Sequence, residues 1–387
     1  MKPNGLLTER WIVAIAVVCL IFAGSFSGLQ LFPSGRATAA SLPARLTDQE
    51  FWNLSRDSSE DDGFFRSDNL LSNETSFQYI IPEVLKSAKQ GRVYLGVGPE
   101  QNFTYIAALK PAMAVLIDIR HGNLDVHLMY KALFELSRDR ADFVSRLFSR
   151  KRPAGLTTQA TARQIFTAYR AAEGSQEIYD ENLKAVEDQL IKKHGFSLSE
   201  GDRDGIRWAL SNFYRFGPAI SYNSSLSGSV APAIVGATGG GGRAFGNNGV
   251  NYASLMMSDD GTGNDRSYLA NEENFVFLKD LETRNLIIPV VGDFGGPKAI
   301  RAVARYLKSI DAIVSAFYVS NVEQFLVQDG KWDTFCASSA TLPLDDTSTF
   351  IRTGRGGPYT LAGGNGVQDS STANMLFEFK GCAAGPR

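Results

Sequence analysis

Two glycines and an acid are the residues of this sequence that are best placed to do chemistry. Gly96 and Gly98 follow a short β-like run at residues 92–95, and Pro99 starts the next helix. Glycines let the backbone turn sharply, so a ligand can approach the N–H groups at the start of that helix. Asp118 ends the next apolar run, where an acid can accept hydrogen bonds from ribose hydroxyls. This pattern predicts a site for a nucleoside-containing ligand; a turn without a ligand and an acid that caps a helix are the alternatives.

The same arrangement, an apolar run followed by polar residues, occurs twice more. Gly292 and Asp293 follow the run at 286–291, and Asn321 follows the run at 312–319. Strands that alternate with helices in this way form a parallel sheet with right-handed crossovers. We therefore expect an α/β fold with a Rossmann-like, mostly parallel sheet, in which the strand ends lie at one edge. For Asp293, a strand end that only caps a helix is the alternative.

These segments resemble class I S-adenosylmethionine (SAM)-dependent methyltransferases. The run VYLGVGPEQNFTYIAALKPAMAVLIDI resembles their first two motifs, NLIIPVVGDF their third strand and SIDAIVSAFYVSN their fourth. The stretches GDFGGPKAIRAVARYLK and FYVSNVEQFL also resemble a bacterial family that has a methyltransferase-like fold and no assigned activity. The resemblance implies SAM as the cofactor and methyl transfer to a small or lipid-like acceptor.

The resemblance also implies a role for individual residues. Gly96 and Gly98 would contact the methionine moiety of SAM, Asp118 its ribose and Asp293 its adenine. Asn321 would lie beside the transferred methyl group, although no residue of the sequence stands out as a catalytic acid or base. The expected cofactor-binding residues are Gly96, Gly98, Glu100, Asn102, Asp118 and Asp293.

Three residues depart from the patterns of nucleotide-binding families. Tyr94 stands where methyltransferases usually carry an acid, and Glu100 stands where a glycine is expected, so its carboxylate would face an approaching cofactor. These departures favour an alternative function, a non-catalytic extracytoplasmic or membrane-anchored binding or scaffold protein that retains the fold. A nicotinamide-dinucleotide protein is a weaker alternative, because Gln101 occupies the last glycine position of GxGxxG.

The N-terminus predicts membrane targeting. Residues 11–24 are apolar or small, Lys2 and Arg10 precede them, and residues 37–39 (ATA) match a signal-peptide cleavage pattern. The apolar run also approaches the length that a helix needs to cross a bilayer. Residues 1–40 are therefore either a signal peptide or a transmembrane anchor, and the layout favours a body outside the cytoplasm. Since SAM is kept in the cytoplasm, methyl transfer requires an anchor that leaves the body on the cytoplasmic side.

The rest of the chain divides into an arm and one domain. Residues 41–76 are polar and predict a linker or arm, and residues 77–387 predict the methyltransferase-like α/β domain. A helical insertion is expected at about 123–270, where it would form a lid or the acceptor pocket. Near the C-terminus, residues 349–352 and 375–379 are predicted to pair as antiparallel strands. The helices expected in the insertion span residues 123–150, 161–172, 177–193 and 202–213.

The composition limits the kinds of partner. The chain is 44% hydrophobic and 21% charged with a formal net charge of −2, which predicts a substantial core and no nucleic-acid partner. We expect a small-molecule ligand instead, and membrane contact through the N-terminal segment. Without a Cys/His cluster, a zinc site of the usual Cys/His kind is not expected. Cys336 and Cys382 either form a disulfide or stay unpaired, and His127 is predicted to be a solvated or core-edge residue.

Overall fold

The structure of the protein is a computed structural model. It describes residues 42–382 except Arg66, Asp68, Asn223 and the ranges 225–249 and 355–368. The signal peptide or transmembrane anchor predicted for residues 1–40 lies outside the described residues. Within the described ranges, no helix combines the length and the apolar character needed to span a bilayer.

Six strands form one sheet in the order β3-β2-β1-β4-β5-β6. The pairs β3–β2, β2–β1, β1–β4 and β4–β5 are parallel, and β6 is antiparallel to β5. The prediction of an α/β fold with a mostly parallel sheet is therefore confirmed. The strand order reverses between β1 and β4, which is the point where sheets of this kind bind ligands at the carboxyl ends of the strands. The strands span Val93–Gly96 (β1), Met113–Asp118 (β2), Ile287–Val291 (β3), Val314–Ser320 (β4), Thr349–Gly354 (β5) and Asp369–Asn374 (β6).

The burial of the strands explains why they appear in the sequence as uninterrupted apolar runs. Every residue of β1, β2 and β3 is buried, as expected for parallel strands that are covered on both faces. Pro289 is compatible with β3 because that strand lies at the edge of the sheet, where a missing backbone N–H leaves no broken ladder bond. The carbonyl of Pro289 accepts a 2.6 Å hydrogen bond from Ser55, which fastens the N-terminal arm to this edge.

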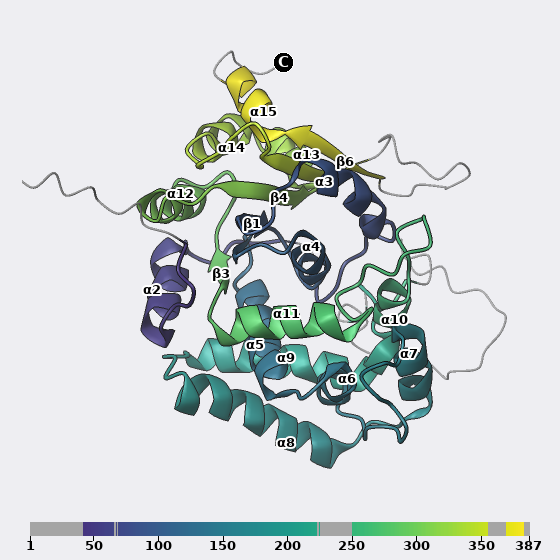
Figure 1. The fold of residues 1–387 in the computed structure, drawn as a ribbon. Coiled ribbons are helices and arrows are strands. Elements are labelled where there is room, and N and C mark those ends of the chain that lie inside the picture. The colour runs from purple at the N-terminus through teal and green to yellow at the C-terminus, as the bar shows by residue number, and fades with distance from the viewer. Residues whose placement is uncertain are drawn as a thin grey trace, which may run out of the picture. The chain divides into compact units, whose positions relative to one another are not determined.

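Helices cover both faces of the sheet (Figure 1). Helices α4 (Gln101–Leu109), α5 (His121–Leu136) and α11 (Glu272–Thr283) pack together on one face, and α12 (Ala299–Ser309) and α14 (Trp332–Ser339) pack together on the other. Right-handed crossovers require this division, because the chain moves from β1 to β3 in one direction and returns from β3 to β4 in the other.

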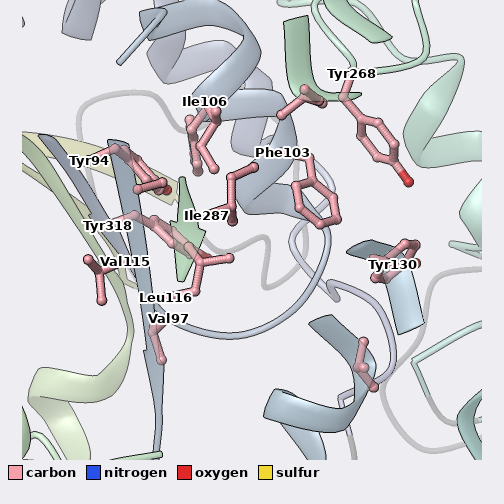
Figure 2. Close-up of a cluster of buried hydrophobic side chains, with 14 of the residues drawn as sticks. Tyr94, Val97, Phe103, Ile106, Val115, Leu116, Tyr130, Tyr268, Ile287 and Tyr318 are labelled. Carbon is pink, nitrogen blue, oxygen red and sulfur yellow. The ribbon is translucent and has the colours of Figure 1, made fainter. Parts of the chain in front are cut away.

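Aromatic side chains fill the layer between α4 and α5. The Phe103 ring meets the rings of Tyr130 and Tyr268 edge to face, with centroids 5.2 and 5.4 Å apart. Figure 2 draws part of this buried cluster together with apolar side chains of the strands. Aromatic pairs in this geometry contribute more than their buried area alone, so α4 is firmly held against α5.

Between β2 and β3 the chain forms the predicted helical insertion. The helix predicted over 123–150 is divided in two, because the chain leaves the α conformation at Ser137 and Asp139 caps a new helix through the Asp142 N–H. Capping boxes at Thr161 and Ser199 begin two further helices close to their predicted starts. Besides α5 and α11, the insertion contains α6 (Arg140–Phe148), α7 (Ala162–Ala171), α8 (Gln176–Glu187), η2 (Asp188–Lys193), α9 (Glu200–Phe216), η3 (Gly217–Ala219) and α10 (Tyr252–Met256).

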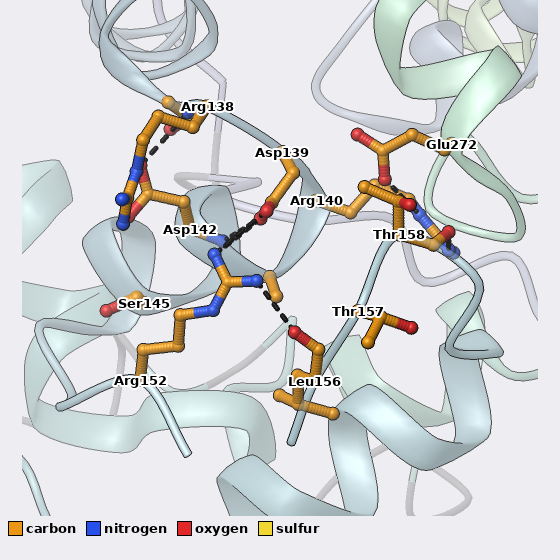
Figure 3. A network of polar contacts seen from close by, with 12 residues as sticks. Arg138, Asp139, Arg140, Asp142, Ser145, Arg152, Leu156, Thr157, Thr158 and Glu272 are labelled. Carbon is orange, nitrogen blue, oxygen red and sulfur yellow. Dashed lines mark hydrogen bonds and ion pairs between the residues drawn. The ribbon is translucent and has the colours of Figure 1, made fainter. Parts of the chain in front are cut away.

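Arg140 links separate segments of the insertion through hydrogen bonds and an ion pair. Its guanidinium donates to the carbonyls of Leu269, Thr158 and Ala160 at 2.8, 2.9 and 2.6 Å, and it pairs with Glu272 at 3.0 Å (Figure 3). Only 2% of the Arg140 side chain is exposed, so these bonds form away from water and hold the insertion against the segment that leads back to the sheet.

The N-terminal arm is more structured than its polar composition predicted. Residues 48–58 form α2, which starts with a capping box between Thr47 and Glu50 and packs against β3. Phe51 and Trp52 of this helix both stack on Phe196 of the insertion. The two aromatic side chains therefore anchor a segment whose other residues are mostly polar. Two short helices, η1 (Phe77–Ile80) and α3 (Ile81–Ser87), then lead to β1.

The C-terminal prediction was partly wrong. Residues 349–352 do lie in a strand, but residues 375–379 lie in helix α15 (Met375–Cys382), and the antiparallel partner of β5 is β6. The reason is that β6 has the polar sequence DSSTAN, which an edge strand tolerates and which hydrophobic patterning cannot detect. Cys336 in α14 is disulfide-bonded. The Cys382 side chain lies outside the described part of the chain.

Candidate functional site

A cavity of about 440 Å³ lies at the carboxyl ends of the parallel strands. This volume is within the range of small-molecule sites, and the position is the switch point of the sheet. The last residues of β2 and β4 and the segments that follow β1 to β4 line it with Val97, Gly98, Pro99, Asp118, Ile119, Arg120, Gly292, Asp293, Phe294, Ser320, Asn321 and Val322.

The N-terminal arm forms a further wall of the cavity. Phe64, Phe65 and Glu74 lie among its lining residues. Phe65 meets Phe325 of α13 (Val322–Gln328) edge to face, with centroids 5.5 Å apart. The arm therefore completes a site that the sheet begins.

The glycine turn after β1 is fixed from inside the protein. Asn102 donates to the carbonyls of Val97, Gly98 and Pro99 at 2.9, 3.1 and 2.8 Å, and its own carbonyl accepts the Tyr94 hydroxyl at 2.8 Å. Asn102 is fully buried and is not part of the cavity lining. Its position indicates that it shapes the turn, whereas the sequence predicted that it binds the cofactor.

The two glycines of the turn have different tasks. Gly98 lines the cavity with a φ of +80°, a conformation that favours glycine. Gly96 does not line it. A Cβ at Gly96 would come within 1.9 Å of Asn102 Oδ1, so Gly96 makes room for the side chain that fixes the turn.

Asp118 lines the same cavity as Gly98, as the sequence predicted, and forms an ion pair with Arg120. Arg120 donates from Nε to Oδ1 at 2.9 Å and from Nη2 to Oδ2 at 2.8 Å, and its backbone N–H also donates to Oδ1 at 2.9 Å. A carboxylate has about four acceptor positions, so these three bonds leave capacity for a ligand hydroxyl.

Asp293 lies on the cavity wall at the end of β3. Its Oδ1 accepts the Gly295 N–H at 2.8 Å, and its Oδ2 pairs with Lys331 at 2.6 Å. The structure thus brings three of the six predicted cofactor-binding residues to one cavity: Gly98, Asp118 and Asp293.

Glu100 lies behind the turn, outside the cavity lining. It is fully buried, its Oε1 accepts the Ser72 N–H at 3.2 Å, and its Oε2 has no hydrogen-bond partner among the described residues. Burial raises the pKa of this carboxyl to about 8, so it is mostly protonated at neutral pH. The carboxylate that the sequence placed in the path of a cofactor is directed to the arm instead.

Glu74 is a cavity residue that the sequence did not indicate. It is almost fully buried and accepts hydrogen bonds from Tyr318 and Thr353, both at 2.8 Å, and from Ser320 at 2.5 Å. Burial raises the pKa of Glu74 even though the three hydroxyls stabilise its charged form. No local motif could have revealed it, because its partners lie on β4 and β5, far away in the sequence.

Ser320 marks the end of β4 with an unusual backbone conformation. Its φ is +52°, which non-glycine residues rarely adopt and which tends to occur at functional sites. The hydrogen bond to Glu74 helps to hold this residue, and the next residue, Asn321, lines the cavity. Asn321 is therefore at the site, as expected from the sequence.

Comparison with known families identifies the chain at the family level. The model of a family described as a domain of unknown function, DUF7790, matches residues 70–200 and 250–378, which together make up more than half of the chain. The chain belongs to the DUF7790 family. The match includes all six strands of the DUF7790 domain and its cavity residues Glu74, Asp118 and Asp293. No curated protein matches the chain.

Proposed function

We propose that the DUF7790 domain binds a nucleoside-containing ligand in this cavity, and that it is a SAM-binding methyltransferase-like protein. The observation that carries the proposal is that Gly98, Asp118 and Asp293 line one cavity at the ends of adjacent parallel strands. The residues suit the parts of such a ligand: a backbone turn in a glycine conformation, and two acids that can accept hydrogen bonds from ribose and adenine.

SAM, when bound, supplies an electrophilic methyl group. Transfer from such a donor needs mainly the alignment of donor and acceptor, and needs little acid–base chemistry. The end of β4 is the proposed acceptor side, because Asn321 lines the cavity there and Ser320 is held in place by Glu74. From the helical insertion that follows β2, Tyr222 is among the lining residues, so a small or lipid-like acceptor would contact the insertion there.

A non-catalytic extracytoplasmic or membrane-anchored binding protein is the second candidate. Asp118 and Asp293, the acids proposed to contact ribose and adenine, already pair with Arg120 and Lys331, so they attract the positively charged SAM less than unpaired acids would. In addition, Cys336 is disulfide-bonded, and disulfides are typical of oxidising compartments, where SAM is not supplied. In this alternative, residues 1–40 direct the body across the membrane or hold it there.

Calorimetry separates the two candidates. The full chain is titrated with SAM and with its demethylated product, and we expect binding of both, weakened about tenfold or more by Asp293→Asn. Asp333→Asn is the matched control, because Asp333 is an exposed acid of α14 outside the cavity lining. If neither ligand binds the folded chain at about 1 mM, the SAM proposal is wrong. Binding without methyl transfer to any acceptor tested would favour the non-catalytic candidate.

A further inference from the structure

Three side chains meet between α5 and α9, outside the cavity described above. His121 and Asp125 lie in the first two turns of α5, and Asp202 lies in the first turn of α9. His121 Nε2 is 2.6 Å from Asp202 Oδ1 and 3.8 Å from Asp125 Oδ1. One nitrogen and two carboxylate oxygens thus lie within 4.8 Å of one another.

Asp125 is the unusual member of this cluster. Its side chain is only 4% exposed, and its Oδ1 has no hydrogen-bond partner among the described residues. A buried carboxylate without a partner is strongly destabilising unless a cation compensates it. Within the cluster, His121 cannot fully meet this need, because its Nε2 is closest to Asp202.

The fold makes room for this carboxylate. Gly205 of α9 faces Asp125, and a Cβ at position 205 would come within 2.0 Å of Asp125 Oδ2. Glycine in a helix interior is less stabilising than alanine, so its presence here needs a reason. The glycine therefore keeps open a space that the Asp125 carboxylate occupies.

The cluster can be reached from solvent. His121 and Asp202 both line a second cavity, of about 740 Å³, and the His121 side chain is 42% exposed. The surroundings add negative charge, since Asp62 accepts the backbone N–H of His121 at 2.7 Å. Three carboxylates around one imidazole favour the binding of a cation.

We propose that His121, Asp125 and Asp202 bind a divalent transition-metal ion. An imidazole nitrogen with two carboxylate oxygens suits zinc, manganese or iron, whereas magnesium and calcium prefer oxygen ligands alone. Three protein ligands leave coordination positions open towards the second cavity. The site does not depend on the proposed SAM function, and the two can be tested separately.

The test is zinc binding by the full chain without a histidine tag, measured by calorimetry near neutral pH. We expect one ion per chain, and a loss of about 100-fold or more in affinity for Asp125→Asn. This variant should fold, because asparagine has nearly the same size and shape as aspartate and places no charge in this buried position. Asp204→Asn, a change to an exposed acid on the same helix, should bind zinc like the wild type.

A second measurement distinguishes this site from adventitious binding. Zinc should raise the melting temperature of the wild type and of Asp204→Asn, but not that of Asp125→Asn or His121→Ala, because a ligand stabilises only the state that binds it. Equal zinc affinity of the wild type and Asp125→Asn would overturn the proposal. So would the absence of zinc binding by the folded wild type at about 1 mM.

Discussion

His127 donates a hydrogen bond from Nε2 to the carbonyl of Gly98 over 2.9 Å, so a side chain of α5 holds the turn after β1. His127 is fully buried, and its Nδ1 has no hydrogen-bond partner among the described residues. Burial lowers the pKa of His127 to about 4, so the ring is neutral at physiological pH. The sequence predicted a solvated or core-edge histidine; the structure instead shows a buried histidine that supports the turn beside the cavity.

This histidine should make the protein sensitive to acid. The unfolded chain binds a proton at His127 below pH 6.5, whereas the folded chain does so only near pH 4, so stability falls as the pH decreases between these values. His127 changes the free energy of unfolding by at most about 1.4 kcal/mol per pH unit. Urea denaturation at several pH values should show that His127→Gln, which can still donate to Gly98, lacks this part of the slope. Identical slopes in both proteins would contradict the neutral buried ring.

Gly98→Ala should weaken SAM binding strongly while lowering the free energy of unfolding only moderately. A side chain at a φ of +80° costs about 1 kcal/mol or more, and relief of that strain would move the turn that lines the cavity. Gly91→Ala is the matched control, because Gly91 has a φ of +71° and open space around it but lies outside the cavity lining. Calorimetry with SAM should show at least about tenfold weaker binding for Gly98→Ala only. An equal loss of SAM affinity in both variants would mean that the turn at Gly98 does not contact the ligand.

Glu74→Ala should loosen the N-terminal arm. The change leaves the hydroxyls of Tyr318, Ser320 and Thr353 without their buried acceptor, which should lower the free energy of unfolding by about 3 kcal/mol. Glu83→Ala, which removes an exposed ion pair with Lys86, should have little effect. Limited proteolysis should cut the arm of Glu74→Ala faster than that of the control. An unchanged cleavage rate would show that Glu74 does not anchor the arm.

The elements that the sequence predicted well are those whose signal is local. The strands β1 to β4 are buried on both faces, so their apolar runs were visible without knowledge of their neighbours. Asp118 is the last residue of such a strand, and Gly98 and Asp293 each lie two residues beyond one; parallel strands bring their carboxyl ends to one edge. Strand position alone therefore predicted that these three residues would lie together, and they line one cavity.

Glu100 and Asn102 were predicted as cofactor contacts but lie outside the cavity lining, and the lining residue Glu74 was not predicted. Glu100 and Asn102 are close to the turn in sequence, but Ser72 and Tyr94 draw their side chains into the interior. Glu74 joins the cavity through residues of β4 and β5, which follow it by more than 240 positions. Such long-range pairings leave no periodic pattern in the chain, and one sequence cannot reveal them.

Arg140→Ala should destabilise the insertion strongly. The buried guanidinium satisfies three carbonyls and Glu272, so its removal should cost about 3–5 kcal/mol. Arg138 is a matched control from the same loop, because its side chain is 76% exposed and pairs only with Asp142 among the described acids (Figure 3). Arg138→Ala should leave the midpoint of chemical denaturation almost unchanged. A similar shift of the denaturation midpoint in both variants would show that the buried contacts of Arg140 do not stabilise the insertion.

The compartment of the body decides between the two proposed functions. If residues 1–40 direct export, an alkaline phosphatase fused after Arg387 should be active, since that reporter folds only outside the cytoplasm. In the same cells, Cys336 should resist alkylation until a reductant is added, because it is disulfide-bonded in the structure. An inactive reporter together with a freely alkylated Cys336 would contradict export. That result would place the body where SAM is available and would favour the methyltransferase over the binding protein.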